Sequence, residues 1–105
     1  MTEFQEKKSK QVKFSYDVKH RNWVGDGFYV HGLLRPTEEL NPYISPFILM
    51  DYASPKKFSK TSHRRGVGEH PHRGFETVTF AYQGGVEHRD SSGGGGTIKS
   101  GDVQW

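Results

Sequence analysis

The rest of the chain is interpreted around one stretch, His70-Pro71-His72-Arg73-Gly74-Phe75-Glu76-Thr77-Val78-Thr79-Phe80. Two imidazoles stand two residues apart, a carboxylate follows four residues later, and a β-branched and aromatic run closes the segment. On a β-strand alternate side chains share a face, so His70, His72 and Glu76 are predicted to point into one cavity. Imidazole and carboxylate together suit iron, zinc, manganese, copper or nickel better than calcium or magnesium. The spacing alone leaves open a pair of solvated surface histidines.

Composition predicts one domain with a thin core. Leu, Ile, Val and Phe make up 22 of the 105 residues, close to the roughly 20% below which highly charged chains tend to be disordered. Seven Phe, five Tyr and two Trp compensate in part, because each aromatic side chain buries a large area. Cysteine is absent, which excludes disulfides and thiolate metal ligands.

The formal net charge is +3, and a basic run of six Lys and Arg with one acid spans residues 56–73. Such a run either contacts phosphate or forms a solvated loop. No aromatic stacking platform accompanies it in the sequence, so we do not expect direct nucleic-acid binding. The first ten residues lack the apolar core of a signal peptide, and no run reaches the roughly 18 apolar residues of a membrane span. We therefore expect a cytoplasmic protein.

Turn residues divide the first half of the chain into short strands. Residues 1–12 are polar and charged, and we expect a loose arm ahead of a domain at 13–105. Alternation of aromatic or apolar with polar residues predicts a half-buried strand over 14–18. The Gly-Asp-Gly of 25–27 predicts a hairpin with positive φ at both glycines. Pro36 should end its second strand.

The most hydrophobic segment, 46–52, predicts a buried strand. We expect Asp51 at its end to accept hydrogen bonds from backbone or from an arginine. The basic loop at 53–69 leads to the histidine pair and is predicted to rim the site. Further strands are expected at 86–90, paired with the strand after Glu76, and then at 97–99 and 103–105. These strands, without a convincing amphipathic helix, indicate an all-β protein.

Several motifs in order resemble one family. The stretch from His70 to Thr79, then His88-Arg89-Asp90-Ser91 and Gly101-Asp102-Val103-Gln104-Trp105, closely resembles the pirins of the cupin superfamily. Val24-Gly25-Asp26-Gly27-Phe28 and Pro46-Phe47-Ile48-Leu49-Met50-Asp51-Tyr52 also match N-terminal pirin segments. The likeness covers residues 23–105.

The resemblance implies a cupin-type double-stranded β-helix, a jelly-roll barrel, around one non-haem Fe²⁺ or another divalent transition metal. His70 and His72 match the histidines of the first cupin motif. Glu76 matches the carboxylate of the general cupin pattern, and its role as metal ligand, proton acceptor or partner of a histidine stays open. Pirins carry further ligands after the segment that ends here at Trp105. We therefore expect an incomplete barrel, a partial N-terminal cupin domain, and a homodimer that covers exposed sheet edges.

Three functions remain open on this resemblance. One is a quercetin 2,3-dioxygenase-type oxidoreductase acting with O₂ on a flavonol-like small molecule. The second is an iron-dependent module that binds protein partners, among them transcription regulators, through the basic loop. The third is an inactive remnant. Among the other histidines, we do not expect His31 to be a ligand, we expect His63 to be solvated, and we interpret His88 as a hydrogen-bonded structural residue.

Overall fold

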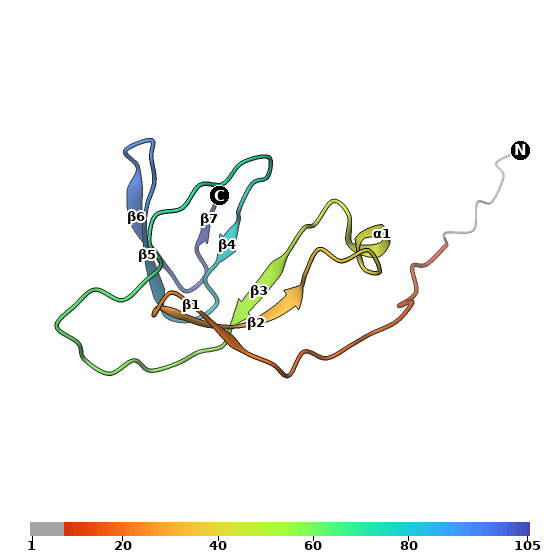
Figure 1. Cartoon of the computed structure of the whole chain (residues 1–105), viewed down its shortest axis with the longest axis horizontal. Coiled ribbons are helices and arrows are strands. Elements are labelled where there is room, and N and C mark those ends of the chain that lie inside the picture. The colour runs from red at the N-terminus through yellow and green to blue at the C-terminus, as the bar shows by residue number, and fades with distance from the viewer. Residues whose placement is uncertain (1–7) are drawn as a thin grey trace, which may run out of the picture.

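The computed structural model describes residues 8–105, in which short antiparallel strands dominate (Figure 1). The elements are β1 (Asn22–Val24), β2 (Phe28–Leu34), α1 (Asn41–Ile44), β3 (Met50–Ala53), β4 (Thr79–Phe80), β5 (Gly85–Arg89), β6 (Gly95–Lys99) and β7 (Val103–Gln104). They form three sheets with strand orders β1-β2-β3, β4-β7 and β5-β6. The predicted all-β class is confirmed. Within the described residues, no helix has the length and apolar character needed to span a bilayer.

The hairpin of β1 and β2 forms where it was predicted, with Trp23 opposite Tyr29. Gly25 has φ +58°, the left-handed conformation expected of it, but the prediction of positive φ at Gly27 is wrong. Gly27 serves a different purpose: a Cβ there would lie 2.7 Å from the Cα of Gly66. The glycine therefore allows two backbones to approach closely.

The segment 14–18 forms no strand, contrary to prediction. β2 is already paired on one side with β1 and on the other with β3, so it offers no free edge to this segment. Instead, the hydroxyl of Tyr16 donates a hydrogen bond to the carbonyl of Leu33. Ring nitrogen Nδ1 of His31 donates to the carbonyl of Val18 at 2.8 Å, so this nitrogen is engaged with the backbone. Of the predicted arm, residues 8–12 are exposed without regular structure, and residues 1–7 lie outside the described residues.

The predicted buried strand at 46–52 is shorter and more exposed than expected. β3 begins only at Met50, because the chain first turns through α1 and a hydrogen bond from Phe47 N to the carbonyl of Ile44 (2.8 Å). Its residues are all exposed, since no second layer covers the sheet. An arginine does lie beside Asp51, whose carboxylate forms an ion pair with Arg35 Nη1 at 2.6 Å.

The pairing of the C-terminal strands differs from prediction. β5 pairs with β6, and β4 pairs with β7, so the predicted hairpin between β4 and β5 is wrong. The cause is a tight local turn. Asp90 accepts hydrogen bonds from the backbone N–H of Ser92 (2.8 Å) and of Gly94 (3.1 Å), which closes the chain between β5 and β6 over a few residues at little entropic cost. The strands predicted at 97–99 and 103–105 are confirmed, the latter over Val103–Gln104.

The core is as thin as the composition predicts. Among residues 8–105, only Val30, Ala81 and Ile98 are buried. The accessible surface is 10126 Å², whereas a compact chain of this mass would have about 6,000 Å². The radius of gyration is 18.4 Å, against about 13 Å for a compact domain of this length. Figure 1 shows the consequence: the three sheets stand apart and do not close around a common interior.

Candidate metal centre

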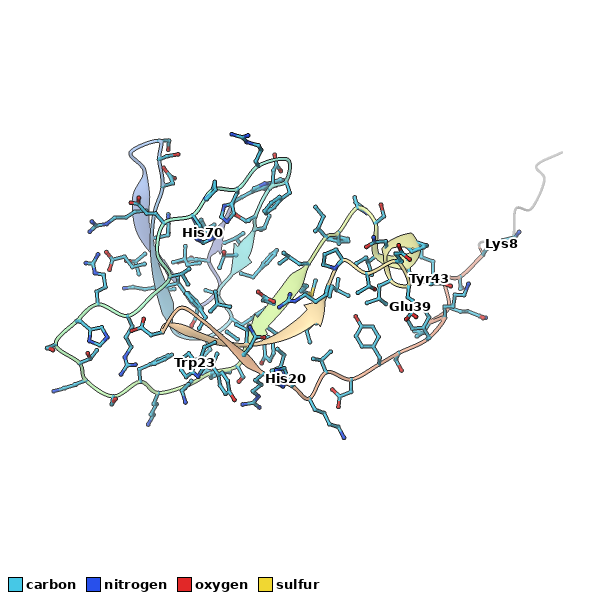
Figure 2. All side chains as sticks on the ribbon, in the orientation of Figure 1. Lys8, His20, Trp23, Glu39, Tyr43 and His70 are labelled. Carbon is cyan, nitrogen blue, oxygen red and sulfur yellow. The ribbon has the colours of Figure 1, made fainter. Side chains whose placement is uncertain are left out.

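His70 and His72 lie on the long connection between β3 and β4, not on a strand. This connection runs from 54 to 78, and β4 begins only at Thr79. The expectation that strand alternation aligns the histidines is therefore wrong. They nonetheless converge: their Nε2 atoms lie 3.0 Å apart, with the rings edge to face at an interplanar angle of 86°. Figure 2 shows His70 on this connection, at the end of the molecule that holds β4 and β7.

The tautomer of His70 follows from its second contact. Its Nδ1 lies 2.8 Å from the carbonyl oxygen of Gly68, and a carbonyl can only accept a hydrogen bond. Nδ1 therefore carries the proton in the neutral ring, and the lone pair is on Nε2, facing His72. A backbone carbonyl behind Nδ1 is the arrangement that orients most metal-binding histidines.

The spacing of the two nitrogens fits one metal ion. With metal–nitrogen bonds of about 2.1 Å, two ligands at a right angle around an octahedral ion lie about 3.0 Å apart. His70 and His72 already have this separation. A metal ion held by both nitrogens would replace the proton of the hydrogen bond between them, because imidazole binds a metal through an unprotonated nitrogen. The donor chemistry and the spacing thus both suit a divalent transition metal.

Glu76 is not part of this convergent pair. Its Oε2 accepts a hydrogen bond from the indole N–H of Trp105 at 3.1 Å, and the side chain is exposed. Across residues 8–105, no three His, Asp or Glu side chains come together as a ligand set. The structure therefore joins two of the three predicted site residues, and the role of Glu76 stays a prediction.

His63 and His88 lie outside the pair. His63 is exposed, as predicted, and its Nε2 lies 3.0 Å from Asp26 Oδ2. His88 is half-buried, and its Nδ1 has no hydrogen-bond partner among the described residues, so the prediction of a hydrogen-bonded ring is not met at this atom. The physical reason is its neighbour in the sheet. His88 lies opposite Gly96 in the β5–β6 ladder, and glycine offers no side chain to pair with it.

A contact that the sequence did not reveal fixes the loop leading to the histidines. Asp26 Oδ1 accepts a hydrogen bond from the N–H of Gly66 (2.8 Å), and Asp26 N donates to the Gly66 carbonyl (3.2 Å). The Gly66 N–H, followed by the bond from His63, lowers the pKa of Asp26 below its ordinary value of 3.8. The Gly-Asp-Gly motif signals a turn, but its partner lies 40 residues away and has no local signature.

The basic loop also has an aromatic support that the sequence interpretation missed. The rings of Trp23 and Tyr29 stack at 4.9 Å, and Phe58 meets Trp23 edge to face at 6.4 Å. Lys56 Nζ lies 5.9 Å from the centres of both stacked rings. Figure 2 shows Trp23 beside the loop. Trp23 and Tyr29 face each other across the hairpin. The register of the two strands, and not the sequence of the loop, could therefore have predicted the stacked pair.

Open antiparallel sheets with a histidine pair on the connection before β4 make an incomplete cupin-type barrel. The solved structure of a quercetin 2,3-dioxygenase from Acinetobacter baumannii shares this fold, with a TM-score of 0.77 and 62% sequence identity over 86% of this chain and 31% of that one. Both the predicted fold and its incompleteness are thereby confirmed.

The pirin family model matches residues 17–105, and the chain belongs to the pirin family. It is 57% identical over 96 residues to a Pseudomonas aeruginosa protein named "Putative quercetin 2,3-dioxygenase", covering 91% of this chain and 33% of the relative. Pirin-like protein 2 of Arabidopsis thaliana is 45% identical, covering 77% of this chain and 23% of the relative. This chain therefore spans about a third or less of the length of these relatives.

Proposed function

We propose that this chain supplies the two-histidine part of the metal site of a quercetin 2,3-dioxygenase-type oxidoreductase. The observation that carries the proposal is the 3.0 Å separation of the His70 and His72 Nε2 atoms. The names of two relatives, from P. aeruginosa and A. baumannii, support the reaction class and the flavonol-like substrate. We assign the site to Fe²⁺ or another divalent transition metal, which when bound supplies Lewis-acid activation of a flavonol oxygen.

The residues around the pair have separate tasks in this proposal. The Gly68 carbonyl keeps the proton of His70 on Nδ1 and so keeps its Nε2 available. The ring of Phe75 lies 5.5 Å from that of His72 and places apolar surface beside it. Apolar cover limits water and favours binding of an aromatic substrate. In this arrangement, the histidines bind the ion and Phe75 contacts the flavonol.

Glu76 is the candidate proton acceptor. Trp105 donates to its Oε2, which holds the carboxylate in one place and leaves Oε1 to accept the proton of a flavonol hydroxyl. A general base must lie within hydrogen-bond reach of the proton that it removes. We assign residues 13–105 to a partial N-terminal cupin domain that brings Glu76 and the histidine pair to the same end of the molecule.

A second candidate function, binding of an acidic protein partner, rests on the basic loop. Lys56 is held against the Trp23 and Tyr29 rings, and Arg65 lies 5.4 Å from the centre of the Phe58 ring. Aromatic rings with cations above them present a firm, positively charged surface. Such a surface favours encounter with negatively charged partners. This role does not exclude the metal site, which lies on a different part of the connection.

Oxygen consumption tests the proposed oxidoreductase. The 105-residue chain is reconstituted with Fe²⁺ under anaerobic conditions, freed of unbound iron, and mixed with quercetin in an oxygen electrode. The proposal predicts uptake above that of the His70→Ala/His72→Ala double variant treated in the same way. The His20→Ala variant is the matched control, because His20 is exposed and distant from the pair in sequence. Equal uptake by the wild type and the double variant would contradict the proposal.

A further inference from the structure

We infer that Asp26, in the turn between β1 and β2, is a positioning residue for the metal site. Its carboxylate fixes the backbone at Gly66, and the fixed backbone places the Gly68 carbonyl that keeps the proton of His70 on Nδ1. The inference rests on the proposed metal-binding function of the histidine pair and deepens it. Because Asp26 is hydrogen bonded to His63 and Gly66, its influence on the pair passes through the loop.

The first observation is the support under the loop. Asp26 lies between two strands that pair in register, with Val24 opposite Phe28, and β2 is the central strand of its sheet. Two hydrogen bonds join this turn to the loop. The Gly66 N–H donates to Asp26 Oδ1 (2.8 Å), and the Asp26 N–H donates to the Gly66 carbonyl (3.2 Å). Both polar groups of the Gly66 backbone are therefore held by the same residue.

The second carboxylate oxygen of Asp26 is bound as well. His63 Nε2 lies 3.0 Å from Asp26 Oδ2, and the hydroxyl of Thr61 lies 2.7 Å from the other ring nitrogen of His63. The Gly66 N–H, and then His63, lower the pKa of Asp26 below its ordinary value, so the carboxylate is ionised at neutral pH. Hydrogen bonds to an ionised acceptor are stronger than those between neutral groups. The loop is thus attached to Asp26 through two of its residues.

The path from this attachment to His70 is short. Gly68 follows Gly66 by two residues, which is at most about 7 Å of chain. Glycine has the largest backbone freedom of any residue, so the two glycines do not fix this path by themselves. The hydrogen bonds to Asp26 supply the restraint at Gly66, and the Gly68 carbonyl lies 2.8 Å from His70 Nδ1. A shift of the backbone at Gly66 therefore moves the acceptor on which the His70 ring depends.

The consequence concerns the lone pair that binds metal. Which nitrogen of a neutral histidine carries the proton is set by the hydrogen bond that the other nitrogen makes. The Gly68 carbonyl keeps the His70 proton on Nδ1 and leaves the lone pair on Nε2, facing His72. If this carbonyl turns away, the proton can move to Nε2, where it blocks the metal. Loss of a group that orients a ligand costs about 10–100-fold in metal affinity.

Two measurements on the same variants test the inference. Long-range proton–nitrogen NMR correlations of the metal-free 105-residue chain, at about pH 8, where histidine is ordinarily neutral, show which nitrogen of His70 carries the proton. Calorimetry measures the affinity for Zn²⁺. Asp26→Ala should shift the His70 proton from Nδ1 toward Nε2 and weaken Zn²⁺ binding about 10–100-fold. Asp26→Asn keeps an oxygen that can accept the Gly66 N–H, so both quantities should stay near those of the wild type.

Two further variants complete the test. Asp17→Ala is the matched control, because Asp17 is an exposed aspartate on the segment before β1, and it should behave like the wild type. Gly27→Ala displaces the same backbone with the Asp26 carboxylate in place, because the added Cβ would lie 2.7 Å from the Cα of Gly66. It should act in the same direction as Asp26→Ala, and it tests the path even if Asp26→Ala fails to fold.

The outcomes separate this inference from the proposed function. A wild-type proton position and Zn²⁺ affinity in folded Asp26→Ala, checked by circular dichroism, would overturn the inference. So would an Asp26→Asn variant that binds Zn²⁺ as weakly as Asp26→Ala, because the hydrogen-bond acceptor would then not be the cause. A wild type that binds no Zn²⁺ would overturn the proposed function instead, and the NMR comparison would still decide whether Asp26 positions His70.

Discussion

The Nε2 atoms of His70 and His72 lie 3.0 Å apart and are joined by a hydrogen bond. The Gly68 carbonyl sets the protonation of the first ring, and the 86° angle between the rings keeps the two nitrogens facing each other. The two nitrogens thus already have a separation that suits two ligands of one divalent metal ion. Preorganisation of this kind lowers the entropic cost of binding.

Glu76→Gln distinguishes a ligand from a proton acceptor. The variant removes the charge but keeps an oxygen that can accept the Trp105 N–H. Because Glu76 does not converge with the histidines, we expect metal content within about twofold of the wild type while quercetin-dependent oxygen uptake falls at least about 100-fold, the usual range for a general base. Elemental analysis and an oxygen electrode measure the two quantities. Loss of metal comparable to that in His72→Ala would instead make Glu76 a ligand.

Gly25→Ala should loosen the loop before the histidines. Gly25 has φ +58°, and an added Cβ would collide with the carbonyl oxygen of Gly66. A strained backbone conformation and a collision together cost about 1–3 kcal/mol, which urea denaturation measures as a lower free energy of unfolding. Gly68→Ala is the matched control, because nothing lies within 4 Å of the position that its added Cβ would take. Equal stability of the two variants would count against the Gly25–Gly66 contact.

Acid should release the loop from the hairpin. The Gly66 N–H and then His63 lower the pKa of Asp26, so the folded state favours the carboxylate. This contribution to stability is complete above the ordinary pKa of 3.8 and is lost as the pH falls through the lowered folded-state value. Amide hydrogen exchange at Gly66, corrected for intrinsic rates, should therefore accelerate below about pH 4. In Asp26→Ala, which has no side-chain acceptor for the Gly66 N–H, the corrected rate should already be high at neutral pH and change little with acid. Unchanged protection in that variant would disprove the contact.

Val30→Ala should show how much the thin core contributes. Val30 is 3% exposed, whereas Val12 is 85% exposed, so the same substitution can be compared at a buried and an open site. Removal of two buried methylene equivalents costs about 1.5 kcal/mol, and Val12→Ala should cost close to nothing. Urea denaturation of both variants checks the difference. If both lose the same stability, burial at Val30 does not hold the sheets together.

The sequence was sufficient where the signal is local. The Gly-Asp-Gly hairpin, the all-β class and the Arg-paired Asp51 all follow from residues close in the chain or from common pairing chemistry. The resemblance of several ordered motifs to pirins correctly indicated the family and the incomplete barrel. His70 and His72 were selected by their spacing, although a connection and not a strand brings their nitrogens together.

The errors share a physical cause, competition between distant segments. The segment 14–18 alternates like a strand, but β1 and β3 already occupy both edges of β2. The turn at Asp90 joins β5 to β6. This pairing leaves β4 to pair with β7. The link from Asp26 to Gly66 spans 40 residues. No local sequence pattern predicts these outcomes, because each depends on which of several segments pairs with a given strand or forms a given hydrogen bond.

Metal content of the reconstituted chain measures directly whether His70 and His72 bind metal. The wild type, His70→Ala/His72→Ala and His20→Ala are each incubated anaerobically with Fe²⁺, desalted and analysed for iron per chain. We expect iron in the wild type and in His20→Ala, and loss of nearly all of it in the double variant. Equal iron in the double variant and the wild type, or no iron in any of the three proteins, would show that His70 and His72 do not hold the metal.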